Sequence, residues 1–262
     1  MVDLNLIKNY FPEQIRNNAL LGKSIMKEYI QLLILDYLST TQYVRKLTFI
    51  GGTCLRLVKG IDRFSEDLDF DSKGINKEEL LQMSNDVIQF LKRNGYKVES
   101  KDKNNPKLTA FRRNIYFPDF LFDIGLSRYR DERFLIKIEA QGQEVNYTRE
   151  IKNIKGCGFY FAFPVPPDTV LCAMKATALL ERGKGRDFYD LMFLLGQTKP
   201  DYDFLEKRIG IKNASELKAE ITKRIKITVL KTKNKDFEHL LFNKENNKRI
   251  LRFEEFLEDA IL

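Results

Sequence analysis

Short apolar runs and a regular alternation of apolar and charged residues in the first half of the chain predict β-strands. Residues 47–50 (LTFI) form an apolar run with two β-branched members, which is typical of a buried strand. Residues 67–71 (DLDFD) alternate with a period of two, so Leu68 and Phe70 are expected to face a core and the three aspartates the opposite side. Further strands are predicted at residues 97–100, 109–117 and 134–140.

Helical periodicity accounts for much of the remaining chain. Apolar residues at spacings of three and four predict helices at residues 23–39 and 77–94, the second capped by Asn76. We expect a short amphipathic segment at residues 3–22, a solvated turn at residues 102–107 and irregular structure at residues 141–168. Four further helices are predicted at residues 201–208, 214–228, 237–241 and 246–262.

A proline-rich stretch separates the two kinds of pattern. Residues 163–168 (FPVPPD) precede a strongly apolar helix at residues 169–182, and a second helix starts at Arg186 after two glycines. We therefore predict an α/β (α+β) domain over residues 1–165 and an all-helical domain over residues 166–262.

Positive charge is concentrated near the C-terminus. The 262-residue chain has a formal net charge of +8, and residues 205–252 contain 14 lysines and arginines against 6 aspartates and glutamates. This segment therefore carries an excess equal to that of the whole chain. Such a basic lobe favours a polyanionic partner, although solvated helix faces of a lysine-rich protein would give the same pattern.

Cysteine and histidine usage narrows the chemistry. Cys54, Cys157 and Cys172 are too widely spaced to suggest a disulfide framework or a thiolate zinc site. The single histidine, His239, is expected in a surface helix, which excludes a conventional Ser-His or Cys-His triad and any metal site with several histidine ligands. No apolar run approaches the ~20 residues of a membrane helix, so a cytoplasmic protein without a membrane partner is expected.

The residues between the first two strands predict a phosphate site next to a metal site. Gly51 and Gly52 break the chain after the first strand, and a short helix is expected behind Thr53, so backbone N–H groups and a hydroxyl would face an anion. Asp67 and Asp69, at i and i+2 of a strand, suit Mg²⁺, which takes hard oxygen ligands. A phosphate cradle beside such a pair favours phosphoryl or nucleotidyl transfer.

An EF-hand is a rival interpretation of the same aspartates. Asp67, Asp69, Asp71 and Glu78 fall at loop positions 1, 3, 5 and 12. Position 6 requires glycine for a sharp turn but is Ser72, and the preceding residues have strand rather than helix periodicity. The nucleotidyl-transfer interpretation therefore explains more of the sequence.

The motif GGTCLRL followed by RFSEDLDF resembles the AbiEii/AbiGii (MenT-like) family of the nucleotidyltransferase superfamily. The resemblance implies a mixed sheet with flanking helices, and it implies that Arg63 and Ser65 join the glycines and Thr53 in binding the nucleoside triphosphate (NTP). It also implies a third metal ligand on a neighbouring strand, for which Glu139 in IKIEA is preferred and Asp123 in LFDIGLS is the competitor.

A second motif lies on the two helices after the proline-rich stretch. A lysine on the first helix and an Arg-Asp-x-Tyr-Asp-Leu run on the second resemble the same family. The matching residues are Lys175, Arg182, Arg186, Asp187 and Asp190. Lys175 would bind the triphosphate, and Asp187 would hold Lys175 or contact the base or sugar; an interhelical salt bridge is the structural alternative.

The resemblance implies an enzyme that moves a nucleoside monophosphate from an NTP to RNA, especially a tRNA end, with Mg²⁺ (two ions, Mn²⁺ as the substitute) as cofactor. It also implies a toxin paired with a cognate antitoxin. Two other classes stay open from the sequence: a transferase acting on a small molecule or a protein hydroxyl, and a non-catalytic RNA-binding module.

Overall fold

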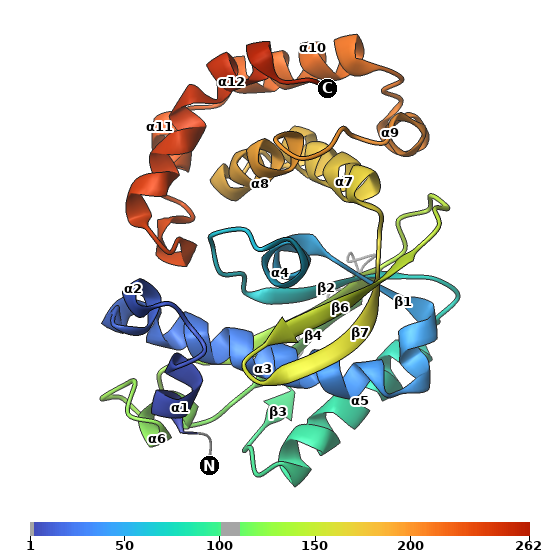
Figure 1. Ribbon diagram of the computed structural model, residues 1–262. Helices are drawn as coiled ribbons and strands as arrows, with labels where there is room; N and C mark the ends of the chain where they lie inside the picture. Colours follow the sequence, from blue (N-terminus) through green and yellow to red (C-terminus); the bar gives the residue numbers. More distant parts are fainter. Residues whose placement is uncertain (1–2, 101–110) are drawn as a thin grey trace. The chain divides into compact units, whose positions relative to one another are not determined.

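The computed structural model describes residues 3–100 and 111–262, and the chain divides into two compact units (Figure 1). The sheet unit comprises Met1–Gly60, Phe64–Gly142 and Ile151–Val165, and the helical unit comprises Ile61–Arg63, Gln143–Glu150 and Pro166–Leu262. The predicted turn at residues 102–107 and the start of the strand predicted at 109–117 lie outside the described residues. Each unit is described by itself below.

A five-stranded mixed sheet forms the centre of the sheet unit, in the order β1-β2-β5-β4-β3. The central pair, β2 and β5, is parallel, and the other pairs are antiparallel. The bounds of these strands are β1 (Leu47–Ile50), β2 (Asp67–Ser72), β3 (Glu99–Ser100), β4 (Phe111–Tyr116) and β5 (Leu135–Gln141). The strands predicted from alternation are confirmed, with β3 shorter than expected.

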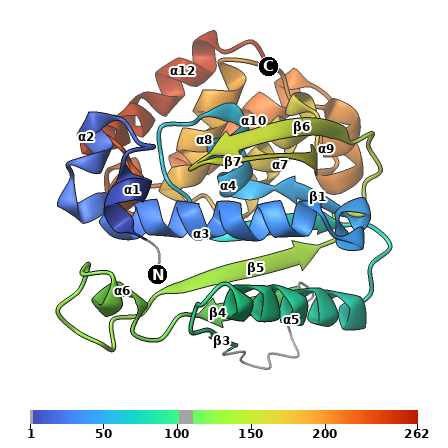
Figure 2. The same ribbon diagram turned by 60° about the horizontal axis from the view of Figure 1, so that its bottom comes forward.

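One face of this sheet is apolar because alternate residues of each strand turn toward the helices. Leu68 of β2 and Ile138 of β5 are register partners and both are fully buried. Helix α5 (Lys77–Arg93) lies on this face, where its Asn85 accepts a hydrogen bond from Arg113 of β4 at 2.7 Å. Helix α3 (Gly22–Ser39) runs beside it (Figure 2). The opposite face of β2 and β5 is left to polar side chains.

The remaining elements of the sheet unit are short except for a β-hairpin. They are α1 (Leu4–Lys8), α2 (Glu13–Arg16), η1 (Ala19–Leu21), η2 (Gln42–Lys46), α4 (Gly51–Cys54), the π-helical turn η3 (Leu55–Lys59) and α6 (Phe120–Asp123). The hairpin consists of β6 (Glu150–Gly156) and β7 (Phe159–Val165).

The expectation of irregular structure over residues 141–168 is therefore wrong. Cys157 and Gly158 form the hairpin turn with φ of 47° and 86°, left-handed values that favour glycine and asparagine rather than cysteine. Strand β6 buries little of its surface and gives a weak alternation. The alternation of Phe159, Phe161 and Phe163 with exposed residues was the signal for β7, and the neighbouring prolines obscured it.

Helices make up most of the helical unit. Their bounds are α7 (Asp168–Glu181), α8 (Gly185–Leu195), α9 (Tyr202–Ile209), α10 (Ala214–Lys226), α11 (Leu230–Lys233), η4 (Glu238–Leu240), η5 (Lys244–Arg252) and α12 (Phe253–Asp259). The segment Ile61–Arg63 joins this unit: Arg63 forms an isolated antiparallel bridge with Leu241, and Phe242 N–H donates to the Asp62 carbonyl at 3.2 Å. None of the helices within the described residues is long and apolar enough to cross a bilayer.

Candidate active site

The turn between β1 and α4 brings the backbone against the carboxylate of Asp69. Gly51 has a φ of +81°, and a Cβ placed on it would lie 2.1 Å from Asp69 Oδ2, so only glycine fits there. Helix α4 begins at Gly51 and includes Thr53, whereas the sequence suggested a helix that starts behind Thr53. The Thr53 hydroxyl is fully buried and donates to the main-chain carbonyl of Asp67, which ties the short helix to the start of β2.

Six polar side chains form two rows across the polar face of β4, β5 and β2, and we call them the charged ladder. The strand register pairs Arg112 with Glu139 and Glu139 with Asp69 in one row. It pairs Asn114 with Lys137 and Lys137 with Asp67 in the other. The predicted carboxylates Asp67, Asp69 and Glu139 are therefore neighbours on one face.

Cations of the chain contact these carboxylates directly. Lys137 Nζ lies 3.0 Å from Asp67 Oδ2 and 2.8 Å from Glu139 Oε1, and Arg112 Nε lies 2.6 Å from Glu139 Oε1. Burial favours the neutral form of Lys137, but its contacts with Glu139 and Asp67 outweigh burial and raise its pKa. Burial likewise acts to raise the pKa of Glu139, and the two cations outweigh it and hold that pKa below the usual range.

The chemistry of this donor set fits a hard divalent cation. Carboxylate oxygens are the ligands that Mg²⁺ prefers, and three of them share the ladder face. As they stand, no three His, Cys, Asp or Glu side chains of the described residues are arranged to hold a metal ion. Lys137 contacts two of the three carboxylates, Asp67 and Glu139.

Helix α3 fixes the segment that leads into β2. The Gln31 amide donates to the Ser65 main-chain carbonyl at 3.2 Å, and Lys27 Nζ lies 3.2 Å from Glu66 Oε1. Ser65 itself is buried. Because 42% of the Glu66 side chain is exposed, this ion pair contributes little, and the buried Gln31 donor is what fixes the main chain two residues before Asp67.

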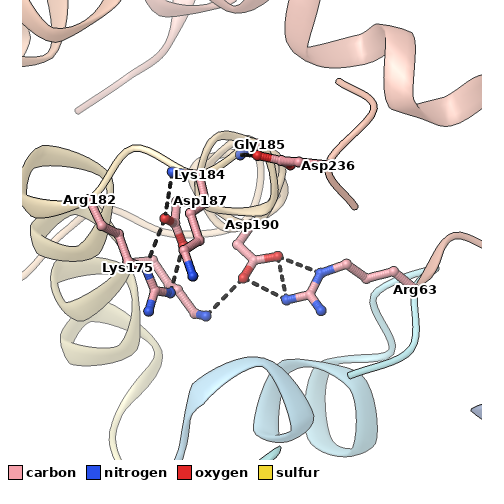
Figure 3. Close-up of polar contacts among 8 residues, drawn as sticks. All are labelled: Arg63, Lys175, Arg182, Lys184, Gly185, Asp187, Asp190 and Asp236. Carbon is pink, nitrogen blue, oxygen red and sulfur yellow. Dashed lines mark hydrogen bonds and ion pairs between the residues drawn. The ribbon is translucent and has the colours of Figure 1, made fainter. Parts of the chain in front are cut away.

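In the helical unit, two residues of the predicted site, Arg63 and Lys175, form a buried ion cluster with Asp190 of the second motif (Figure 3). Arg63 Nε and Nη2 donate to the two carboxylate oxygens of Asp190 at 2.7 and 2.6 Å, and Lys175 Nζ lies 2.8 Å from Asp190 Oδ2. Burial acts to raise the pKa of Asp190, but Arg63 and Lys175 outweigh it and lower that pKa. Lys175 is therefore held by Asp190 of α8 and not by Asp187.

Asp187 has different partners, drawn in the same view (Figure 3). Arg182 donates to its two carboxylate oxygens at 2.9 and 2.7 Å, and the Lys184 N–H donates to Oδ2 at 3.0 Å. Because this last bond satisfies a free N–H at the start of α8, Asp187 stabilises the α7–α8 turn. Arg63, Lys175, Asp187 and Asp190 therefore have structural contacts inside one unit.

The structure separates the two candidates for the third carboxylate by position. Glu139 lies beside Asp69 on paired strands. Asp123 ends helix α6, with its Oδ2 3.9 Å from the exposed ammonium of Lys97. Sequence reasoning missed Lys137, although its place two residues before Glu139 on a strand put it on the same face.

The contact between Gly51 and Asp69 supplies a first prediction. Gly51→Ala is expected to reduce transfer activity by at least about tenfold, because the new Cβ displaces the Asp69 carboxylate, and the strained backbone costs about 1–3 kcal/mol of stability. Gly60→Ala is the matched control, since Gly60 also has a positive φ, of +73°, but apart from its chain neighbours no atom of the described residues lies within 4 Å of a Cβ added to it. Equal activity of the two variants would contradict a role for this close approach.

A family model described as the nucleotidyl transferase AbiEii toxin of a type IV toxin-antitoxin system matches residues 33–261. The chain belongs to the AbiEii nucleotidyltransferase toxin family. No curated protein matches the sequence.

Solved structures agree with the AbiEii family fold. MenT4, a nucleotidyltransferase toxin from Mycobacterium tuberculosis H37Rv, matches with a TM-score of 0.64 at 17% identity, covering 100% of this chain and 91% of that one. A protein from H. pylori crystallised as a candidate nucleotidyltransferase matches with a TM-score of 0.51 at 21% identity, covering 95% of each chain. These likenesses confirm the predicted mixed α/β fold with flanking helices.

Proposed function

We propose that this AbiEii family member transfers a nucleoside monophosphate from an NTP to a hydroxyl group of RNA, with a tRNA end as the acceptor. The observation that carries the proposal is the strand register that sets Asp69 beside Glu139, with Asp67 on the same face and Gly51 against Asp69. A carboxylate cluster next to a glycine turn suits a triphosphate and its metal.

Asp67, Asp69 and Glu139 are the proposed ligands of Mg²⁺, as two ions, or of Mn²⁺ in its place. When bound, these ions would neutralise charge on the α-phosphate and activate the incoming hydroxyl. Gly51 and Gly52 allow the backbone close to the phosphates. The buried hydroxyl of Thr53 holds the start of β2 in position for this chemistry.

Residues of both motifs complete the proposed set of NTP-binding groups. Ser65 precedes Asp67 by two residues, and its carbonyl is fixed by Gln31. Arg63, Lys175 and Asp187 are proposed for the triphosphate and the nucleoside by resemblance to the family. Their contacts in the helical unit indicate that Asp190 orients Arg63 and Lys175 and that Arg182 orients Asp187.

The type IV toxin-antitoxin label of the family implies an antitoxin partner and a nucleotide substrate. We propose a cytoplasmic toxin that a cognate antitoxin neutralises. RNA as the acceptor is supported by the basic segment at residues 205–252, in which Lys223, Lys226 and Lys231 are exposed.

The test is incubation of the purified protein with each α-labelled NTP, Mg²⁺ and total cellular RNA. Label in the RNA fraction, lost when EDTA is added, is the expected result. Label that enters the protein or a small molecule would make one of those the acceptor class instead. Label from no NTP would contradict nucleotidyl transfer itself.

Charge reversal tests the basic surface separately. Changing Lys223, Lys226 and Lys231 to glutamate is expected to weaken RNA binding and to reduce the slope of log affinity against log salt by about three times 0.7, the value for single-stranded contacts. Lys77→Glu, Lys92→Glu and Lys155→Glu, at three exposed lysines outside the basic segment, make the same change in net charge and serve as the control. If RNA affinity changes neither with salt nor with the charge reversal, these lysines are a solvated helix face and do not bind RNA.

A further inference from the structure

Lys137 lies between two carboxylates of the charged ladder. It projects from β5 with the main chain paired on both sides, opposite Asp67 of β2 and Asn114 of β4. Its ammonium contacts Asp67 and Glu139 at 3.0 and 2.8 Å, and 24% of its side chain is exposed. The exposed part matters because an ammonium that leaves the carboxylates can be hydrated without crossing the core.

Lys137 reduces the negative charge of this face from an excess of two to an excess of one. Three carboxylates, Asp67, Asp69 and Glu139, share the face with Lys137 and Arg112, and within the described residues Arg112 pairs with Glu139. Removing the ammonium would leave Asp67 without the contact that joins it to Glu139. Carboxylates on neighbouring positions of paired strands repel one another unless a cation lies among them.

We propose that Lys137 is a built-in counter-ion that competes with the divalent ion for Asp67 and Glu139. The inference rests on the proposed function, since it takes these carboxylates as metal ligands. Without an ion, the ammonium holds the two strands' carboxylates together; when an ion binds, the flexible stem of lysine carries the ammonium aside. Metal binding is then an exchange of cations, and Lys137 sets how much free ion the toxin needs.

The test measures ion affinity directly and needs no substrate. Binding of Mn²⁺ is followed through the electron paramagnetic resonance signal of the free ion, at fixed ionic strength, for the full-length wild type, Lys137→Met, Lys137→Arg and Lys155→Met. Lys155 is an exposed lysine of β6, so its variant makes the same change in net charge away from the ladder. Unfolding temperatures are recorded in EDTA and in Mn²⁺.

Lys137→Met is expected to bind Mn²⁺ about tenfold more tightly or better, because a competing unit charge is gone. This variant should also unfold at a lower temperature than the wild type in EDTA, and added Mn²⁺ should raise its unfolding temperature by more. Lys137→Arg keeps the charge and should stay close to the wild type, as should Lys155→Met.

The outcomes separate this inference from the proposed function. Equal Mn²⁺ affinity in the wild type and Lys137→Met overturns the exchange and leaves the metal site standing. Weaker binding in Lys137→Met also overturns it, because Lys137 would then support the ion. If neither protein binds Mn²⁺, the metal assignment in the proposed function fails, and this inference fails with it.

Discussion

Asp69→Asn and Asp67→Asn are each expected to lower nucleotidyl transfer by a factor on the order of 10³, because each removes a carboxylate that would hold the ions at the reacting phosphate. Both variants should stay folded. Asp67 and Lys137 are partly exposed, with 21% and 24% of their side chains accessible, and loss of such an ion pair costs at most about 1 kcal/mol. Activity is measured with labelled NTP, and folding by thermal unfolding.

Glu66→Gln is the matched control for these variants. Glu66 precedes Asp67 and pairs with Lys27 of α3 at 3.2 Å, and no register pair places it in the charged ladder. This variant loses one carboxylate charge and should keep its activity within a few fold. If both aspartate variants transfer nucleotide at the wild-type rate, the charged ladder has no part in catalysis.

Asp190→Asn is expected to destabilise the protein by about 3–5 kcal/mol, the largest stability effect that we predict. Its carboxylate is the acceptor for Arg63 and Lys175, and all three side chains are buried. The asparagine leaves two cations in a site shielded from water without the opposite charge. Chemical denaturation measures the loss as a change in the free energy of unfolding.

A second substitution and a pH series separate this effect from a simple packing defect. Lys175→Met in the Asp190→Asn background should recover part of the loss, because one uncompensated charge is removed while the stem's packing is kept. Asp259→Asn, at an exposed position at the end of α12, should change stability little. No recovery in the double variant would show that the charges are not the cause.

The pH dependence has a defined sign. The pKa of Asp190 is lowered in the folded protein, so the stability it contributes is fully present above the ordinary aspartate pKa of about 3.9 and is lost as pH falls through the folded-state value. The difference in stability between the wild type and Asp190→Asn should therefore be constant near neutral pH and shrink in acid. A difference that grows on acidification would contradict the assignment.

Local patterns predicted the parts of the site that lie close together in the sequence. Alternation over residues 67–71 placed Leu68 and Phe70 in the core, and both are buried. Asp71, expected on the polar face by the same alternation, is buried as well, because the period of two says which side a residue faces and not how much that side is covered.

Local patterns could not predict contacts between residues far apart in the sequence, and the place of Glu139 beside Asp69 was expected only from the resemblance to the family. The opposite charges of Lys175 and Asp187 suggested an ion pair. In the structure Asp187 pairs with Arg182 instead, and Lys175 pairs with Asp190. The register of β5 against β2 sets Lys137 beside Asp67, and no local signal determines the register of two parallel strands separated by such a long crossover.

The path of the chain sets an order of events during synthesis. Arg63 leaves the ribosome early but finds its carboxylate on Asp190, 127 residues later, and its backbone partner Leu241 later still. Domains fold from the N-terminus while synthesis continues. The first motif is therefore synthesised long before Asp190, and until then Arg63 lacks its carboxylate partner. A gene cut after Val165 would encode every strand that the structure describes and would leave that arginine without Asp190, the residue that neutralises it.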